Sequence, residues 1–286
     1  MKARIALTLA PWSTDPLPTV LDVLAGAGYG GALIEENHLQ PWRDELGRFR
    51  DLWEEREIHI AACSVAGSWQ EQAHLQDELE RLRPMAELLA ELECEHAVLS
   101  LPVRRELVLV AGYQNLRQPF ALTESRLQYL GEALNVIAEV LLDVGIKPSI
   151  RNRLGTQLET AEELHQLMDT TEPELVSLTL DVGQAMVAGT HPEALVRQYA
   201  SRIGLLICKD IDLTILKETR DDLYDYDEFL HRGGIVPLGQ GHIDFMQVLL
   251  PMMSSLMAGD WLVIDPQGPQ LGPVESAETR REYLQE

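Results

Sequence analysis

Polar and charged residues follow five of the apolar runs in this sequence, each at the point where the run ends. In chain order they are Glu35, Glu36 and His38, then Arg151 and Arg153, then Asp181 and Gln184, then Lys209 and Asp210, and finally Asp265. If these runs are parallel strands of one closed sheet, their ends surround one pocket. Carboxylates in such a pocket can move protons or hold a metal, and cations can bind an anionic substrate.

Two carboxylates, Asp181 and Asp265, are the first candidates for catalysis, and Arg151 is the third. A guanidinium stays protonated in proteins and has no lone pair for a metal, so Arg151 supplies a fixed positive charge. Because its planar fork can donate to two carboxylates, we expect an ion cluster in which Arg151 bridges Asp181 and Asp265. The alternative is a register shifted by one residue, with Arg151 pointing elsewhere.

A second set of side chains forms a candidate wall for the substrate: Arg153, Lys209, His38, Glu36 and Gln184. The three cations of this set can bind a phosphate or a carboxylate, which Arg recognises through two parallel hydrogen bonds. The alternative is that each cation pairs with a neighbouring acid, and that Lys209 with Asp210 only closes its strand. Adjacent strand residues face opposite ways, so at most one of Glu35 and Glu36 points inward.

The elements that must position these residues alternate along the whole chain. Short β-rich runs alternate with longer segments of helical period, as expected when crossover helices join parallel strands. Most runs are apolar at consecutive positions, which is typical of strands buried on both faces. The predicted strands are 5–9, 31–35, 59–65, 96–101, 147–151, 176–180, 204–208 and 261–264. Eight such units predict one (β/α)8 TIM barrel domain over residues 1–286.

Helix boundaries are marked as well. Thr160 precedes Glu163 with the spacing of a capping box, which predicts a helix beginning after Thr160. Gly28, Gly145 and Gly259 come just before predicted strands, where a left-handed residue can end a helix.

Two long segments, 103–121 and 211–241, show no regular period and follow predicted strands. In a closed barrel the loops after the strands surround the active site, so both are candidate lids or substrate walls. A doubly wound open sheet is the alternative to a barrel. The glycine-rich dinucleotide fingerprint that would favour it is absent after the first strand.

Composition excludes several classes of protein. The 23 Lys and Arg against 46 Asp and Glu give a formal net charge of -23, a field that repels phosphate backbones, so we expect no nucleic-acid partner. No apolar stretch approaches the roughly 20 residues that span a bilayer, and residues 5–10 are too few for a signal peptide. We therefore expect a cytoplasmic protein without membrane contact. Cys63, Cys94 and Cys208 lack metal-knuckle spacing, which favours core positions.

Five short motifs occur in order in the second half of the chain. Residues 151–156, Arg-Asn-Arg-Leu-Gly-Thr, are similar to a family segment Glu-Asn-His-x-Gly-Thr, and 180–184, Leu-Asp-Val-Gly-Gln, to Leu-Asp-x-Gly-His. Residues 207–210, Ile-Cys-Lys-Asp, are similar to His-x-Lys-Asp. Residues 237–241 resemble a Gly-x-Gly turn, and 264–266 resemble a strand-eight Ile-Glu-x. Together the motifs resemble the xylose isomerase-like superfamily of sugar-phosphate isomerases, epimerases and inosose dehydratases.

The resemblance implies a (β/α)8 barrel with one divalent ion, such as manganese, magnesium or zinc, held by Glu, Asp, His and Glu at the ends of strands five to eight. The aligned residues here are Arg151, Asp181, Ile207 and Asp265. Two carboxylates remain, and a cation lies beside them. We therefore predict no metal ligands and no cofactor in this chain.

In the metal-dependent relatives, the ion polarises a carbonyl and stabilises an enediolate while acidic residues move the proton. The sequence accordingly predicts a divergent sugar-phosphate isomerase- or epimerase-like protein that acts on, or binds, a small polyhydroxy ketone, sugar or keto acid without that metal. The alternative is a non-catalytic barrel that binds a ligand or a partner enzyme. A third interpretation is the family's endonuclease branch. That branch needs a basic groove for DNA, and the net charge of -23 argues against one. A homo-oligomer is compatible with the sequence.

At physiological salt we expect no appreciable affinity for duplex or abasic DNA, because the sequence offers no basic stripe that would release counterions. A mobility-shift titration with a short duplex measures this. Tight binding that weakens steeply with added salt would restore the endonuclease interpretation.

Overall fold

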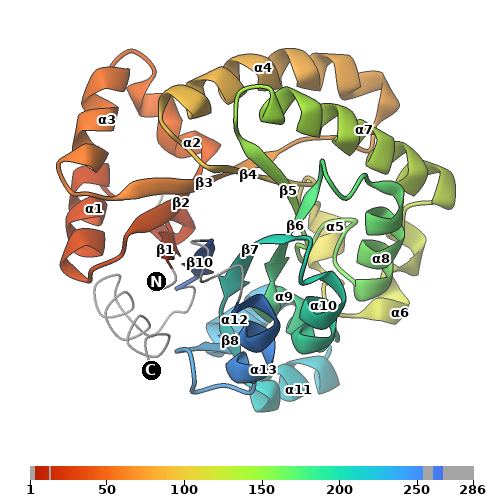
Figure 1. The fold of residues 1–286 in the computed structure, drawn as a ribbon. Helices are drawn as coiled ribbons and strands as arrows, with labels where there is room; N and C mark the ends of the chain where they lie inside the picture. The colour runs from red at the N-terminus through yellow and green to blue at the C-terminus, as the bar shows by residue number, and fades with distance from the viewer. Residues whose placement is uncertain (1–3, 13, 254–259, 267–286) are drawn as a thin grey trace.

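The computed structural model describes residues 4–12, 14–253 and 260–266, and eight of its strands close into a parallel barrel (Figure 1). The barrel strands are β1 (Arg4–Thr8), β2 (Gly31–Glu35), β3 (His59–Ala66), β4 (His96–Ser100), β5 (Lys147–Arg151), β6 (Ser177–Asp181), β7 (Ile203–Cys208) and β10 (Trp261–Ile264). Each pairs with its neighbours in this series, and β1 closes the barrel on β10. The predicted (β/α)8 barrel is confirmed. Strands β2, β5 and β10 have the predicted bounds, β3, β4 and β7 differ by one residue at one end, and β1 and β6 are shifted by one residue.

Helices surround the strands (Figure 1). The longer ones are α1 (Leu17–Gly26), α3 (Leu46–Glu54), α4 (Leu75–Glu91), α7 (Glu124–Leu142), α8 (Ala161–Thr170), α10 (Pro192–Tyr199) and α11 (Leu213–Asp221). The shorter ones are α2 (Glu36–Leu39), α5 (Arg105–Val108), α6 (Gln114–Arg117), α9 (Val182–Val187), α12 (Tyr226–His231) and α13 (Phe245–Leu249). Among the described residues, no helix is long and apolar enough to cross a membrane.

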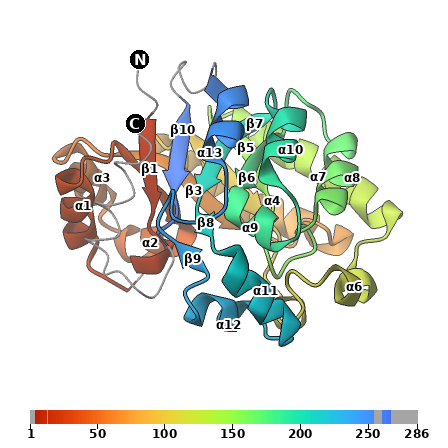
Figure 2. The ribbon, with the colours of Figure 1, turned by 90° about the horizontal axis from the view of Figure 1, so that it is seen from below.

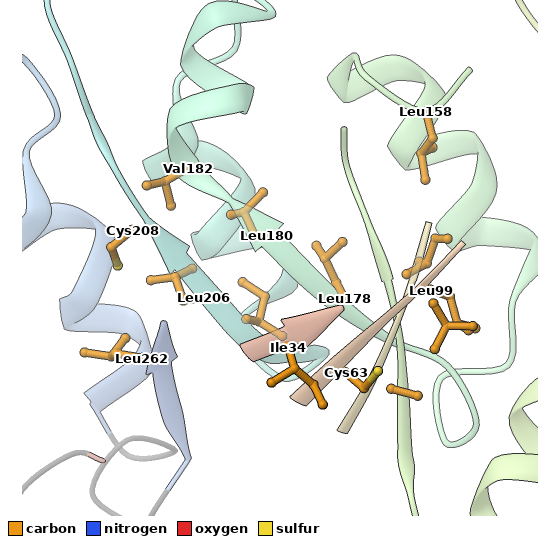
Figure 3. Close-up of a cluster of buried hydrophobic side chains, with 14 of the residues drawn as sticks. Ile34, Cys63, Leu99, Leu158, Leu178, Leu180, Val182, Leu206, Cys208 and Leu262 are labelled. Atoms are coloured by element: carbon orange, nitrogen blue, oxygen red, sulfur yellow. The ribbon is translucent and has the colours of Figure 1, made fainter. Parts of the chain in front are cut away.

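Two apolar layers follow from the alternation of strand side chains. On β6, Leu178 and Leu180 belong to the large cluster packed between strands and helices (Figure 3). The residue between them, Thr179, instead meets Ser149 of β5 inside the barrel, where their hydroxyl oxygens are 2.6 Å apart. A smaller apolar cluster fills the barrel interior with Ala6, Leu33, Ala61, Ala62, Val98, Leu205, Ile207, Trp261 and Val263. The same alternation turns Asp181, two residues after Thr179, toward the interior.

The predicted helix boundaries agree with the structure where it describes them. Thr160 caps α8, accepting from the Glu163 N–H at 3.2 Å, and Glu163 accepts from the Thr160 N–H at 2.9 Å. Gly28 and Gly145 adopt φ of 73° and 84°, the left-handed conformation that ends the preceding helices. Gly259 lies outside the described residues.

The segments 103–121 and 211–241 are not irregular, which corrects the expectation from the sequence. The first contains α5 and α6, and the second contains α11, α12 and a small antiparallel sheet of β8 (Asp210–Ile211) and β9 (Ile235–Val236). Helices of one or two turns are too short to show a clear period in an 11- to 18-residue window. In Figure 2, α6, α11 and α12 lie at the end of the barrel toward which β10 points. Tyr113 links the two segments by donating to the Tyr224 carbonyl at 2.6 Å.

The opposite end of the barrel is closed by charged and aromatic groups. Arg4 lies over the Trp261 ring, 4.2 Å from its centroid, and donates twice to Glu95 at 2.6 and 2.7 Å. His96 at the start of β4 is 2% exposed, and within the described part of the chain neither ring nitrogen has a hydrogen-bond partner. Burial, and then the charge of Lys147, lower the pKa of His96 to about 4.

His96 predicts a loss of stability in acid. Above the unfolded-state pKa near 6.5 both states hold a neutral imidazole, but between that pH and 4 only the unfolded state gains a proton. The folded state should lose about 3 kcal/mol across this window, with no further loss from His96 below it. Urea titrations from pH 7 to 4 should show the loss in wild type and a shallower slope in His96→Gln. The exposed-histidine control His74→Gln should keep the wild-type slope, and equal slopes for all three proteins would refute the assignment to His96.

Candidate active site

Four charged side chains meet at the carboxyl ends of the adjacent strands β5, β6, β7 and β10, and we call them the ion cluster: Arg151, Asp181, Lys209 and Asp265. Lys209 Nζ lies 3.2 Å from Asp181 Oδ2 and 2.8 Å from Asp265 Oδ2. Arg151 Nη2 lies 2.5 Å from Asp181 Oδ2 and 4.0 Å from Asp265 Oδ2. Two cations and two carboxylates therefore balance in formal charge.

Lys209 lies between the two carboxylates, where the sequence led us to expect Arg151. Arg151 does contact both aspartates, but its short contact is to Asp181 alone. The cause is the alternation along β7, which points Ile207 into the barrel, Cys208 toward the helices, and Lys209, one residue beyond the strand, inward again. Lys209 thus pairs with Asp181 and Asp265 and not with its sequence neighbour Asp210.

Burial and pairing hold the cluster in its charged form. The side chains of Lys209 and Asp181 are 0% exposed. Burial alone would lower the pKa of Lys209, but Asp181 and Asp265 together raise it above the ordinary lysine value. Burial likewise raises the pKa of Asp181, and the opposing charges of Lys209 and Arg151 leave that pKa below the ordinary aspartate value. Lys209 is therefore an ammonium and Asp181 a carboxylate at neutral pH.

The motif at 180–184 positions Asp181 and leaves space for the side chain of Lys209. Asp181 caps α9 by accepting the Gln184 N–H at 3.0 Å, and Gln184 Oε1 accepts the Leu154 N–H at 2.6 Å. A Cβ atom on Gly183 would lie 2.1 Å from Lys209 Cγ, so only glycine leaves room for the lysine stem. Gln184, a predicted substrate residue, is thus bonded to the loop after β5.

Asn152 is a positioning residue to which the sequence assigned no role, although it follows a predicted strand end. Its Oδ1 accepts the Asp181 N–H at 2.8 Å, and its Nδ2 donates to the Asp181 carbonyl at 3.2 Å. These two bonds extend the β5–β6 pairing beyond the end of β5 and fix the backbone that carries Asp181. The signal was available in the segment 151–156, where this Asn matches the family pattern.

Asp210 has a structural role in the loop that returns to the barrel. Its carboxylate is buried and accepts four backbone N–H groups, from Ile211, Gly239 and Gly241 at 2.9 Å and from Ile243 at 3.1 Å. A Cβ atom on Gly241 would lie 2.2 Å from Asp210 Oδ1. This requirement explains the glycine turn at 237–241.

The polar residues after β2 form their hydrogen bonds and ion pairs with groups outside the ion cluster. Glu36 pairs with Arg81 of α4 at 2.7 Å and accepts the Ala66 N–H at 3.2 Å. His38 Nδ1 lies 3.1 Å from the Glu35 backbone nitrogen and 3.3 Å from the Glu35 carbonyl oxygen, so it contacts the Glu35 backbone in either tautomer, and the second ring nitrogen is Nε2. That Nε2 is buried without a hydrogen-bond partner in the described part of the chain. Glu35 is the residue of this group whose charge acts on Arg151 and raises its pKa, after the larger effects of Asp181 and Asp265.

Tyr226 on α12 is a second residue near the site that the sequence gave no reason to single out. Its hydroxyl is buried and has no hydrogen-bond partner among the described residues. Burial raises the pKa of Tyr226 to about 12, against the opposing charge of Lys209. Tyr226 is therefore a neutral hydrogen-bond donor at neutral pH, carried by the segment 211–241.

The donor set at the strand ends does not fit a divalent ion. Asp181 and Asp265 direct their Oδ2 atoms to the ammonium of Lys209, and Arg151 adds a second cation. Throughout the described ranges, no three His, Cys, Asp or Glu side chains are grouped so that they could hold a metal. A dication placed between these carboxylates would meet two positive charges in a buried setting.

Replacing Lys209 should destabilise the fold strongly. Lys209→Met leaves two buried carboxylates with one guanidinium, which should lower the free energy of unfolding by about 3 to 5 kcal/mol. Adding Asp265→Asn restores the charge balance and should recover part of this loss. Urea unfolding measures both, with Lys217→Met, an exposed lysine that also pairs with an aspartate, as the control that changes little. Equal effects at positions 209 and 217 would contradict the role of Lys209.

Comparison with known proteins agrees with the barrel and its motifs. The family model "Xylose isomerase-like TIM barrel" matches residues 21–285. An inosose dehydratase of Geobacillus kaustophilus is 27% identical over 297 residues, 98% of this chain and 93% of the relative. The IOLI protein with a binding zinc atom has a TM-score of 0.74 at 16% identity, covering 99% of this chain and 96% of that one. L-ribulose 3-epimerase has a TM-score of 0.72 at 18% identity, covering 99% and 93%.

The two structural similarities establish the fold alone, because their sequence identities are low. The family match spans nearly the whole chain and includes all four strand ends of the ion cluster. With its closed barrel and its ordered motifs, this chain belongs to the xylose isomerase-like TIM barrel family.

Proposed function

We propose that this chain is a carbohydrate-processing enzyme that removes a proton next to the carbonyl of a small polyhydroxy ketone, sugar or keto acid. The observation that carries the proposal is the ion cluster, which fixes two cations at the end of the barrel where the loops after the strands converge. In this proposal Arg151, which stands at a ligand position of the family, supplies positive charge where the family uses a divalent ion, and Lys209, which matches the family motif, supports it.

The chemistry needs a cation at the carbonyl oxygen. Removing the neighbouring proton places negative charge on that oxygen, and fixed positive groups in a buried site stabilise this charge. Arg151 is the cation that a substrate can touch, since its side chain is 10% exposed and its buried Nε has no acceptor in the described part of the chain. Lys209 is fully buried, so it does not contact the substrate. It is a positioning residue that pairs with both aspartates.

The two carboxylates have different roles in the proposed reaction. Asp181 accepts from Arg151 and from the Gln184 N–H, and its lowered pKa makes it a weak base. We assign proton transfer to Asp265, across Lys209 from Asp181. Because the pKa of Lys209 is raised, this lysine remains protonated and serves neither as a base nor as an imine-forming nucleophile.

Dehydration is the net reaction that we favour. After Asp265 has taken the proton, the hydroxyl group on the next carbon leaves, and the proton returned by Asp265 makes it water, so that the product is an unsaturated ketone. The Geobacillus kaustophilus relative, which matches over 93% of its own length, is named inosose dehydratase, which supports this choice. An isomerase or epimerase, the expectation from the sequence, shares the first step and returns the proton to another position or face.

A barrel that binds without turnover is the second candidate. It is favoured by the balance and burial of the ion cluster, because a closed network of this kind can hold four strands together without any reaction. Isotope exchange separates the two candidates, since it detects proton removal whatever the net reaction is.

The test is exchange of the hydrogen next to the carbonyl in deuterated water, followed by NMR. Inosose, D-fructose and 2-keto-D-gluconate form the substrate panel. Wild type should catalyse exchange on at least one of them, and prior treatment with a chelator should leave the rate unchanged. Arg151→Gln should slow exchange by about 100-fold or more, the usual cost of losing a donor to the developing oxyanion. The exposed-arginine control Arg48→Gln should match wild type.

Two results would overturn the proposal. Exchange that a chelator abolishes and manganese restores would contradict the fixed-cation site. Absence of exchange on every substrate, in a protein with an unchanged melting temperature, would favour the binding barrel.

A further inference from the structure

The backbone of Arg153 is held by hydrogen bonds, while its guanidinium has no polar partner among the described residues. It lies two residues beyond β5, and its N–H donates to the Leu158 carbonyl at 2.8 Å while its carbonyl accepts from Thr156 Oγ1 at 2.7 Å. The side chain is half-buried. Within the described residues, its guanidinium forms neither a hydrogen bond nor an ion pair.

This absence is unusual in so acidic a chain. With 46 Asp and Glu against 23 Lys and Arg, partners for a cation are abundant. The other Lys and Arg side chains of the described ranges that lack a hydrogen bond or an ion pair are exposed to solvent: Arg43, Arg83, Arg105 and Lys147. Water solvates those four, but a half-buried guanidinium loses part of its hydration without a compensating anion.

The surroundings of Arg153 explain why the cluster acids leave it unpaired. Asp181 and Asp265 lie near enough to act on it, but Lys209 and Arg151 already balance them. The Glu35 carboxylate, also nearby, accepts the backbone N–H of His38. Burial, and then the positive charge of Arg151, lower the pKa of Arg153, and these outweigh the three acids. The positive charge of Arg153 would therefore gain from an added anion.

We infer that Arg153 binds an oxyanion group of the substrate, a carboxylate or a phosphate, while the ion cluster acts on the neighbouring carbonyl. This inference rests on the proposed function of the same site. Of the three cations that the sequence offered for such a group, Lys209 pairs inside the cluster and His38 contacts the backbone of Glu35. Arg153 stays charged and has no ion pair among the described residues.

Three sugars with one stereochemistry test the inference. D-Fructose carries a hydroxymethyl group beside its ketone, 2-keto-D-gluconate carries a carboxylate there, and D-fructose 1-phosphate carries a phosphate. Calorimetric titration of wild type should show one of the two anions binding about tenfold or more tighter than fructose, with affinity that falls as salt rises. The preferred anion identifies the oxyanion as carboxylate or phosphate.

Variants assign the preference to one side chain. Arg153→Gln should remove the preference for the anion, and Arg153→Lys should keep part of it, since the charge stays and the bidentate geometry is lost. Arg83→Gln, on the outer helix α4, should bind as wild type does. Because the unpaired guanidinium is costly in the free protein, Arg153→Gln should leave the melting temperature unchanged or raise it, whereas a structural arginine would lower it.

The outcomes separate this inference from the proposed function. Fructose binding as tightly as both anions, failure of both anions to bind wild type, or an unchanged preference in Arg153→Gln would each overturn the role of Arg153. Deuterium exchange on the same sugars is read in parallel. Deuterium exchange without an Arg153-dependent preference for the anion supports the proposed reaction and rejects the role of Arg153. A preference for the anion without exchange supports the role of Arg153 and rejects the proposed reaction.

Discussion

The ammonium of Lys209 between two buried carboxylates is the interaction on which the carboxyl end of this barrel depends. Each of these charges would cost several kcal/mol to bury alone, so the strands that carry them are stable only in the register that brings them together. Gly183 gives the lysine stem its path, and Asn152 fixes the backbone of Asp181. The residues around the ion cluster thus support one arrangement of its four charges.

The barrel could be predicted because its strands are apolar at consecutive positions, which is why β2, β5 and β10 match residue for residue. The meeting of Asp181 with Asp265 followed from the strand ends alone. Alternation along β7 accounts for the inward direction of Lys209, but its position between Asp181 and Asp265 was not predicted, because a sequence does not show how far a four-carbon side chain reaches. The helices α5 and α6 were not predicted, because one helical turn is too short to show a hydrophobic period of 3.6 residues.

Residues that match the family motifs and residues that depart from them both build the carboxyl end of this barrel. Asn152 and Asp210 match the motifs and fix backbone, and Gly183 matches them and leaves room for the Lys209 side chain. Asp181 and Lys209 of the ion cluster match the motifs as well. Arg151 and Ile207 depart from them, the first joining the ion cluster and the second filling the barrel interior. The family's scaffold is therefore present here with two of its motif charges, Asp181 and Lys209, and with Arg151 as an added cation.

Because both cations of the cluster are side chains of the chain itself, assembling the site and folding the barrel are one event. A bound ion is loaded by mass action and its occupancy follows supply, whereas Lys209 and Arg151 are present in every folded molecule. The raised pKa of Lys209 and the lowered pKa of Asp181 also move their titrations away from neutrality. The electric field that these two groups create is thus a permanent property of the folded chain.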